Sequence, residues 1–500
     1  MAKKNKDQKE NSDLELQTII GNQITNGLGY LGGQLSDQRR KSLEYYLGDK
    51  LGTEIDGRSQ VVSTDVSDTI ESLLPNLLRV FTASDNVVRC EPMTAEDVPM
   101  ADQATAYLNH VFYKENNGFQ LLYNFFKDAL IEKNGFLKIY WDDSEKVDYE
   151  TYENLSPVEK EALQDTKDEI EIVDEEVFED EDAKEQFEAT LAQYEAQGMD
   201  VSQIQVPNFN LYNCKIKRIK KTGKVKIESV PPEEFLIERN AKTIDDADFV
   251  AHKVLMTRSD LVSMGYSQDE VDELPKSDLD IYNNEEIVRM RDIDSYNIST
   301  PTDSSTEKVL IYECYIKYDY DGDGIAELRK VVAAGSDGSH ILSNMPCDNI
   351  PFVTVTPIPM PHRFYGRSIS ELVEDVQLMK STVMRQLLDN MYLTNNNRVA
   401  IMDGMVNMDD LLTTRPGGIV RTKQPPNQVL QPLQAQPISQ QAFPLLSYLD
   451  SVREGRTGVS KEAQGLSPDT LNAKTATGVN ALMTQTQMRS ELIARVFAET

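Results

Sequence analysis

The chain has 500 residues, of which 39% are hydrophobic and 27% charged, a balance typical of a globular protein. This length exceeds what one hydrophobic core usually serves, so we expect several domains or one domain with large extensions. The formal net charge of −32 disfavours tight nucleic-acid binding through a broad basic face. No run of 18 or more apolar residues occurs, so no membrane partner is expected.

The N-terminal residues 1–37 are expected to form a flexible tail. Basic residues occur there without the apolar stretch of a signal peptide behind them,. The four cysteines lie far apart and form no C-x-x-C pair, which argues against a disulfide framework or a zinc knuckle. A reducing cytoplasm fits this pattern. The cysteines are Cys90, Cys214, Cys314 and Cys347.

The next part of the chain is predicted to be helical. Apolar residues recur at helical spacing in residues 63–81, where Pro75 is expected to kink or divide the helix,. Residues 100–135 predict two more helices, broken near Asn116–Gly118 and stopped at Gly135,. The sequence FLKIYWDD (136–143) then alternates apolar and polar residues, which predicts a half-buried strand,.

An acidic insert follows at 143–205. Residues 151–200 contain 18 acidic and 3 basic side chains, and their recurring apolar residues favour amphipathic helices on an extension over the alternative, a purely disordered tract. After the insert, NCKIKRIKKTGKVKIESV (213–230) alternates isoleucine with lysine on both sides of Thr222–Gly223, which predicts a hairpin. Its lysines are expected to protect the exposed face of a sheet. The segment 209–357 is predicted to be rich in strands.

The stretch YDYDGDGIAELRK (318–330) places Asp319, Asp321 and Asp323 on alternate positions between two strand-like segments. A helical calcium loop would need a bidentate Glu at its twelfth position, where this sequence has Lys330,. We therefore interpret the stretch as the tight turn of a hairpin, for which Asp and Gly are well suited. A weak Ca²⁺ site formed by the three aspartates is the alternative, and no cofactor is expected to be required.

The sharpest pattern is a long helix within 361–397. Ser368 and Glu371 form a capping box, and about 26 residues follow with apolar side chains on one face, which predicts a rod of roughly 39 Å. A segment of strand and turn character comes next, and then a second helix in which Pro444 suits the N1 position,. A polar loop and a final helix follow, and this helix is expected to continue beyond Thr500.

This order of elements resembles the stem, clip, stem and tunnel-loop run of tailed-phage portal proteins. It is carried by FYGRSISELVEDVQLMKSTVMRQLLDNMYLTNN, by LLSYLDSVREGRTGVS and by the segments between and after them, while residues 57–81, 135–143 and 230–261 resemble the wing of short-tailed-phage portals. The resemblance implies an α+β portal fold. Its parts would be the tail 1–37, the wing 38–366, stem helix 1 at 367–397, the clip 398–437, stem helix 2 at 438–456, the tunnel loop 457–474 and a post-tunnel helix 475–500.

The resemblance also implies a function. Such portals form twelve-subunit rings at one capsid vertex, conduct double-stranded DNA during packaging and ejection, and dock the terminase large subunit and then the tail adaptor. Major capsid and scaffolding proteins would be further partners, and the location would be the virion, after assembly in the host cytoplasm. An acidic channel wall fits sliding DNA, because each phosphate neutralised by Lys or Arg adds affinity.

Particular residues receive roles from the same resemblance, each beside a plainer interpretation. The DNA-facing lysines would flank the tunnel loop, although lone lysines are often simply solvated. The clip contacts to terminase and adaptor could equally only shape turns. The apolar stem residues would pack between subunits. The DNA-facing lysines are Lys461 and Lys474, and the clip contacts are Asp409, Asp410 and Arg415. The apolar stem residues at the subunit interface are Leu372, Val376, Val383, Leu387 and Leu449.

Two other classes of protein compete with the portal hypothesis. An enzyme is disfavoured because the four histidines are scattered and no nucleophile-elbow, zinc-protease or phosphate-loop motif occurs,. A calcium-stabilised structural or adaptor protein of the virion, without a DNA channel, is the alternative function. Loss of thermal stability in EDTA would favour it.

Overall fold

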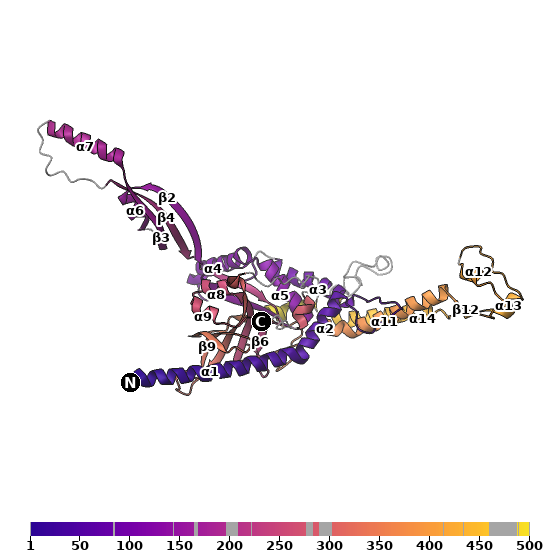
Figure 1. Ribbon diagram of the computed structural model, residues 1–500. Coiled ribbons are helices and arrows are strands. Elements are labelled where there is room, and N and C mark those ends of the chain that lie inside the picture. The colour runs from indigo at the N-terminus through magenta and orange to yellow at the C-terminus, as the bar shows by residue number, and fades with distance from the viewer. Residues whose placement is uncertain are drawn as a thin grey trace. The chain divides into compact units, whose positions relative to one another are not determined.

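The computed structural model describes residues 2–83, 86–143, 145–164, 169–196, 209–221, 223–276, 284–289, 303–413, 415–433, 435–459, 488 and 490–499. It combines helices and sheets in two compact units, residues 1–138 with 227–500 and residues 139–226 (Figure 1). Among the described helices, none is long and apolar enough to cross a membrane.

The chain begins with a helix, and not with the predicted flexible tail. Helix α1 spans Ala2–Tyr30 and leads through a π-helical turn, Leu31–Leu35, into α2 (Ser36–Leu47). Leu16, Ile20 and Ile24 are fully buried against the sheet described next. Their i, i+4 spacing gives α1 one apolar stripe, and burial of that stripe stabilises the helix in place. Residues 2–37 are therefore helical, and not the flexible tail predicted for residues 1–37.

A five-stranded antiparallel sheet forms the centre of the first unit, in the order β10-β9-β8-β7-β6 (Figure 1). The strands are β6 (Phe235–Ile237), β7 (Phe249–Thr257), β8 (Lys308–Tyr318), β9 (Glu327–Ala334) and β10 (His340–Pro346). Side chains of β8 alternate between the faces: Tyr312 and Cys314 contact the α1 side, and Tyr315 contacts the other. Three short helices adjoin this part, α8 (Arg258–Ser263), α9 (Gln268–Asp272) and α10 (Asn284–Arg289).

An aromatic cluster joins this sheet to a smaller one. Phe136 stacks on Phe235 with ring centroids 4.1 Å apart, and Phe352 and Phe364 complete the group. The smaller sheet has the order β11-β1-β5, from β1 (Gly135–Asp142), β5 (Lys224–Val230) and β11 (Phe352–Val355). The strand predicted at 136–143 is thus confirmed.

A largely buried carboxylate lies on the central sheet. Glu313 of β8 pairs with Lys138 and, at 2.7 Å, with Lys330. Burial alone would raise the pKa of Glu313, but the two lysines lower this pKa to about 2. The carboxylate is therefore charged throughout the neutral range, and its two cations satisfy it.

The largest core is helical. It is built from α2, α3 (Asp65–Thr82) and α5 (Gly118–Glu132), together with the start of α11 (Ser370–Asn395). Helix α4 (Val98–His110) precedes α5. Helix α3 runs through Pro75 as one element, because its apolar stripe on both sides of the proline is buried. The expected division at Pro75 does not occur.

The second unit contains helices, as predicted for the acidic insert, but also a three-stranded sheet that was not predicted. Its strands β2 (Glu145–Leu155), β3 (Glu169–Glu179) and β4 (Asn210–Lys221) have the antiparallel order β2-β4-β3. Helices α6 (Pro157–Gln164) and α7 (Glu181–Ala196) accompany them. The acidic strands flank the basic one, so Lys217 pairs with Glu171 and Arg218 with Glu150, both at 3.0 Å.

This pairing also corrects the predicted hairpin at 213–230. Strands β4 and β5 exist, but β4 pairs with β2 and β3 while β5 belongs to the sheet of β1 and β11. The charges explain the choice, because β4 finds glutamates on both neighbouring strands,. The lysines there balance an acidic sheet as well as facing solvent.

Candidate functional site: the stem helices, their base and the clip

Two long helices and a small sheet form the part that resembles a stem and clip. Helix α11 has 26 residues, as predicted. Its capping box is confirmed, because the Ser368 backbone N–H donates to Glu371 Oε2 at 3.3 Å and the Glu371 N–H donates to Ser368 Oγ at 3.2 Å,. The second helix, α14, spans Ser439–Thr457. Pro444 lies inside α14 and not at the predicted N1 position, because the helix begins five residues earlier.

The two helices pack side by side and antiparallel (Figure 1). At one end, Asn390 accepts a hydrogen bond from the Ile438 N–H at 3.2 Å and donates to the Gln436 carbonyl at 2.9 Å. At the other end, Arg456 pairs with Asp375 at 2.5 Å. Contacts at both ends fix the register of the pair.

This packing changes the interpretation of the predicted subunit contacts. Val376, Leu387 and Leu449 are buried within the chain, at 0, 8 and 4% exposure, so their side chains have little surface left for a neighbour. Leu372 packs partly buried against the helical core, and Val383 is half-buried. The role of all five residues in subunit contacts stays a prediction.

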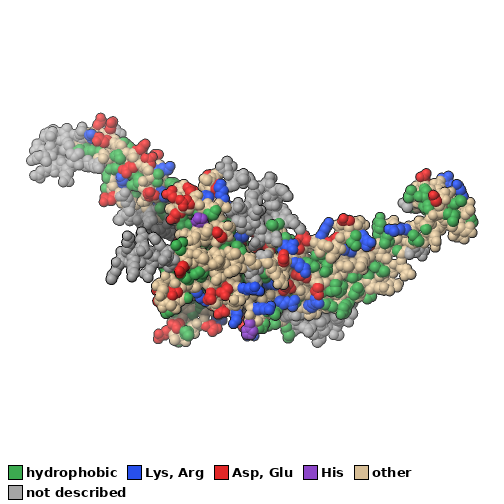
Figure 2. Space-filling model, turned by 60° about the horizontal axis from the view of Figure 1, so that its bottom comes forward, with side chains coloured by type: hydrophobic (Ala, Val, Ile, Leu, Met, Phe, Trp, Pro, Cys, Tyr) green, Lys and Arg blue, Asp and Glu red, His purple; other side chains and the backbone are tan. Residues whose placement is uncertain are grey.

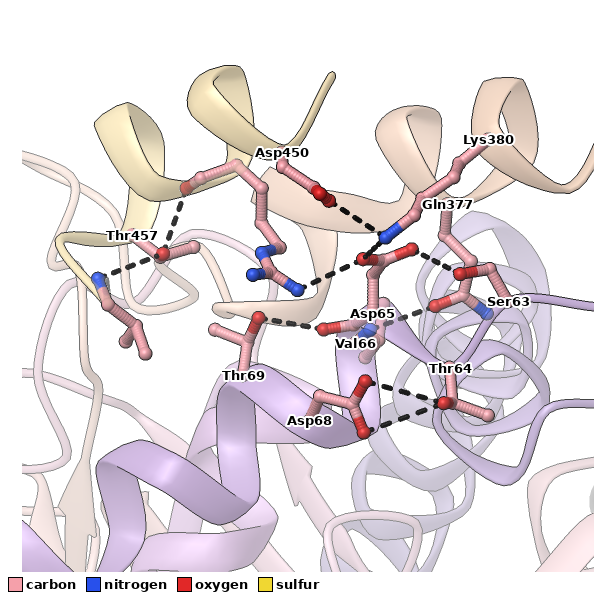
Figure 3. Close-up of polar contacts among 12 residues, drawn as sticks. Ser63, Thr64, Asp65, Val66, Asp68, Thr69, Gln377, Lys380, Asp450 and Thr457 are labelled. Carbon is pink, nitrogen blue, oxygen red and sulfur yellow. Dashed lines mark hydrogen bonds and ion pairs between the residues drawn. The ribbon is translucent and has the colours of Figure 1, made fainter. Parts of the chain in front are cut away.

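A buried polar cluster lies at the base of the stem, where α3, α11 and α14 meet (Figure 3). Asp65, the first residue of α3, is 1% exposed. Its carboxylate accepts from Lys380 Nζ of α11 at 2.7 Å and from Arg453 Nη1 of α14 at 3.0 Å. Lys380 also pairs with Asp450 at 2.8 Å. Two cations thus balance two carboxylates in a position largely shielded from water.

We call this group, Asp65, Lys380, Asp450 and Arg453, the base cluster. Its electrostatics favour the charged state of Lys380. Burial alone would lower the pKa of Lys380, but hydrogen bonds to Asp450 and Asp65 outweigh it and raise that pKa above its ordinary value. Gln377, fully buried, accepts from the Val66 N–H at 2.8 Å and donates to the Tyr45 carbonyl at 2.9 Å. The start of α3 is therefore joined to both stem helices through groups that have few alternative partners.

Further along α11, the segment before α3 is bound to the stem. Arg385, 6% exposed, pairs with Glu54 and donates from Nε to the Val61 carbonyl at 2.8 Å. The Ser59 N–H donates to Asp389 Oδ1 at 2.8 Å. These contacts extend the support of α11 well beyond its first turns.

The clip is a small unit between the stem helices. Strand β12 (Arg398–Ile401) pairs antiparallel with β13 (Leu430–Leu433), and two short helices lie between them, α12 (Met408–Leu412) and α13 (Pro426–Val429). Buried Val406 and Val429 supply its small core.

The three residues predicted for clip contacts differ in their engagement. Arg421 binds the Asp410 carboxylate with both Nε and Nη2, at 2.6 and 3.0 Å, and this pairing lowers the pKa of Asp410. Asp410 therefore helps to shape the clip. Asp409 and Arg415 are exposed, so their roles toward terminase and adaptor stay predictions.

The tunnel-loop lysines Lys461 and Lys474 lie outside the described residues. The end of the following helix is described, and there Ile493, Ala494 and Phe497 are buried in the helical core. The Phe497 ring lies 4.8 Å from that of Phe126. The apolar side of this helix thus packs on the chain itself.

The aspartate run 319–323 joins β8 to β9 as the predicted hairpin, with Tyr318 opposite Glu327. Asp319 Oδ1 accepts from the Gly322 N–H at 2.7 Å, and its Oδ2 accepts from the Gly324 N–H at 2.8 Å. Both glycines have positive φ, 79° and 87°, which suits Gly. The carboxylates serve the turn in this structure, and the weak Ca²⁺ site stays a prediction.

The stem retains apolar surface beyond the buried stripe. Figure 2 shows hydrophobic side chains interspersed with basic ones along this part of the first unit. On α11 the exposed group includes Met391 and Tyr392, and on α14 it includes Phe443 and Tyr448, with exposures from 49 to 70%. Aromatic and Met side chains of this kind are enriched in protein interfaces.

A comparison with models of known protein families identifies the family of this chain. The family model of the phage SU10 portal protein matches residues 16–500. The chain belongs to the phage SU10 portal protein family. It is therefore a phage portal protein, a structural component of the capsid. The family match spans both stem helices and the clip, so the expected resemblance to portals is confirmed.

Sequence reasoning missed the base cluster. Lys380 lies one turn after Val376 and two turns after Val373, so a polar residue on the buried face of the helix was visible as a signal. Its partner Asp65, however, is more than 300 residues away in the sequence. No spacing rule connects such distant residues, and their contact required the structure.

Proposed function

We propose that this chain is one subunit of the portal ring at a single capsid vertex, through which double-stranded DNA is packaged and later ejected. The observation that carries the proposal is the antiparallel stem pair, anchored at its base by the buried Asp65 cluster and ending in the small clip, in a chain of the portal family. Twelve copies would close the ring, and the virion would be its location.

The exposed apolar group on the stem supports assembly through this part of the chain. Met391, Tyr392, Phe443 and Tyr448 would pack against neighbouring subunits, together with those of the predicted interface residues that are only partly buried, Leu372 and Val383. Aromatic side chains bury large areas at low entropic cost, so a few of them can carry much of an interface.

The clip would face the terminase large subunit during packaging and the tail adaptor afterwards. Asp409 and Arg415 are exposed there, next to apolar Leu412 and Ile419, at 72 and 80% exposure. A surface that combines apolar side chains with both charge signs can bind successive partners. Lys461 and Lys474 are proposed to face DNA from the tunnel loop.

Mass photometry of purified protein tests the proposal. Wild type is expected as a large oligomer, and Tyr448→Asp is expected to shift it to monomers with an unchanged circular dichroism spectrum. Val262→Asp places the same charge at an exposed site on α8 (41% exposed) and should leave the oligomer intact. A monomeric wild type, or an oligomer that Tyr448→Asp does not disturb, would contradict the assembly model.

A further inference from the structure

A second buried ionic cluster lies in the first unit, away from the stem. It joins α2, the end of α5, the segment before β6, and α10. We call it the α10 cluster. Its members are Arg39, Asp128, Glu132, Glu233, Glu285 and Arg289.

Arg289 of α10 holds three of the carboxylates. Its guanidinium donates to Glu132 Oε1 at 2.7 Å and to both oxygens of Glu233 at 3.0 Å, and it lies 3.5 Å from Asp128. Arg39, fully buried, is directed mainly to backbone: it donates to the carbonyls of residues 132 and 232. It stands 4.0 Å from Glu285, too far for a hydrogen bond.

The formal charges of the described members of the α10 cluster do not balance. Among the described residues, four carboxylates face two guanidinium groups, which gives an excess of two negative charges when all four carboxylates are ionised. Two described lysines lie nearby and are shared with carboxylates outside the cluster. Lys127 pairs with Glu71 at 3.1 Å and also interacts with Asp128, and Lys253 interacts with Glu286 and Glu234 as well as with Glu233. Uncompensated charge of this size is costly in a buried position.

Two carboxylate oxygens of the α10 cluster lack a compensating hydrogen bond among the described residues. Glu132 Oε2 and Glu285 Oε2 are buried and have no hydrogen-bond partner within the part of the chain that the structure describes, in side chains that are each 2% exposed. Glu132, Glu233 and Glu285 each offer one carboxylate oxygen, and these oxygens lie within 4.8 Å of one another. The base cluster around Asp65, where two cations meet two carboxylates, shows no such deficit.

We propose that the α10 cluster binds one hard divalent cation, Ca²⁺, Mg²⁺ or Mn²⁺, through Glu132, Glu233 and Glu285. Carboxylate oxygens are the ligands these ions prefer, and one divalent ion cancels the excess charge. Glu132 would use one oxygen for Arg289 and the other for the cation. Bound there, the ion would fasten α10 to α2 and α5. This site is independent of ring assembly and of the exposed aspartate turn.

The test is thermal unfolding of the full chain at pH 8, in EDTA and in millimolar CaCl2, MgCl2 or MnCl2. At least one cation should raise the Tm of wild type by a few degrees, because ligands that bind only the folded state stabilise it. Equilibrium dialysis should find one cation per chain bound at the lowest concentrations. Glu285→Gln should abolish this response and, in EDTA, unfold at or above the wild-type temperature, because it removes one excess charge.

Two further variants keep the test decisive. Glu132→Gln should lose the cation-dependent rise in Tm, as Glu285→Gln does. If one of the two variants folds poorly, the other still tests the site. Asp321→Asn in the exposed turn keeps an oxygen that accepts from the Asp323 N–H and should respond like wild type.

The proposal is overturned if Glu285→Gln retains the full response, if Asp321→Asn alone abolishes it, or if wild type does not respond. A wild type whose Tm ignores cations but falls steadily between pH 6 and pH 8 would show that protons balance the cluster instead. Ring assembly is measured separately, so failure here leaves the portal proposal intact.

Discussion

Replacement of Asp65 by Asn tests whether the base cluster holds the stem to the body. The substitution keeps the shape of the side chain and removes its charge. Lys380 retains Asp450, whereas Arg453, 4% exposed, loses its carboxylate partner among the described residues, and its Nε already has no partner. Removal of one partner from a buried ion pair costs roughly 3–5 kcal/mol. We expect about 3 kcal/mol, since one of the two cations stays paired.

Urea unfolding of the full chain, followed by circular dichroism at 222 nm, measures this cost. The fluorescence of Trp141, the chain's single tryptophan, reports on the second unit and should be unchanged. Asp68→Asn, one turn later on an exposed face of α3, is the matched control and should cost less than about 1 kcal/mol. In the Asp65→Asn background, Arg453→Met should recover at least half of the loss, because it removes the unpaired charge. Equal effects of the Asp65 and Asp68 changes would refute the reasoning.

Three further predictions concern the sheet, the clip and the loop. Because the folded pKa of Glu313 is about 2 and its unfolded pKa is about 4.3, its contribution, on the order of 3 kcal/mol, is present above roughly pH 5 and is lost as the pH falls toward 2. Glu313→Gln should therefore unfold at a lower temperature than wild type at pH 7, with the gap narrowing to about half by pH 3, and a gap independent of pH would contradict this. Asp409→Lys with Arg415→Glu should leave rings intact by mass photometry but weaken terminase binding at least tenfold in surface plasmon resonance; unchanged affinity would remove these residues from the interface. Deletion of residues 461–474 should preserve assembly and impair DNA retention in heads, and normally filled heads would count against the loop's role.

Elements that depend on local pattern were predictable from the sequence. The capping box at Ser368, the length of α11, the strand at 136–143 and the hairpin at 318–330 all follow from residues close together in the chain. Each combines a period with a turn or cap signal, and such signals act within a few residues. Tertiary packing did not overturn them.

The failures involve pairing at long range. The acidic insert forms a sheet because its glutamates meet the basic strand β4, which comes some 40 residues later. Helix α1 is ordered because Leu16, Ile20 and Ile24 find the distant central sheet. A sequence pattern shows that an apolar face needs a partner, but it does not identify the partner.

The central claim is that the stem helices of many copies surround a channel that conducts DNA. Electron microscopy of the purified full chain tests it most directly. We expect closed rings of about twelve subunits, the number implied by the resemblance to portal proteins, with α11 and α14 lining a central opening wide enough for duplex DNA. Particles without an opening, or rings in which the stem helices lie on the outer rim, would contradict it.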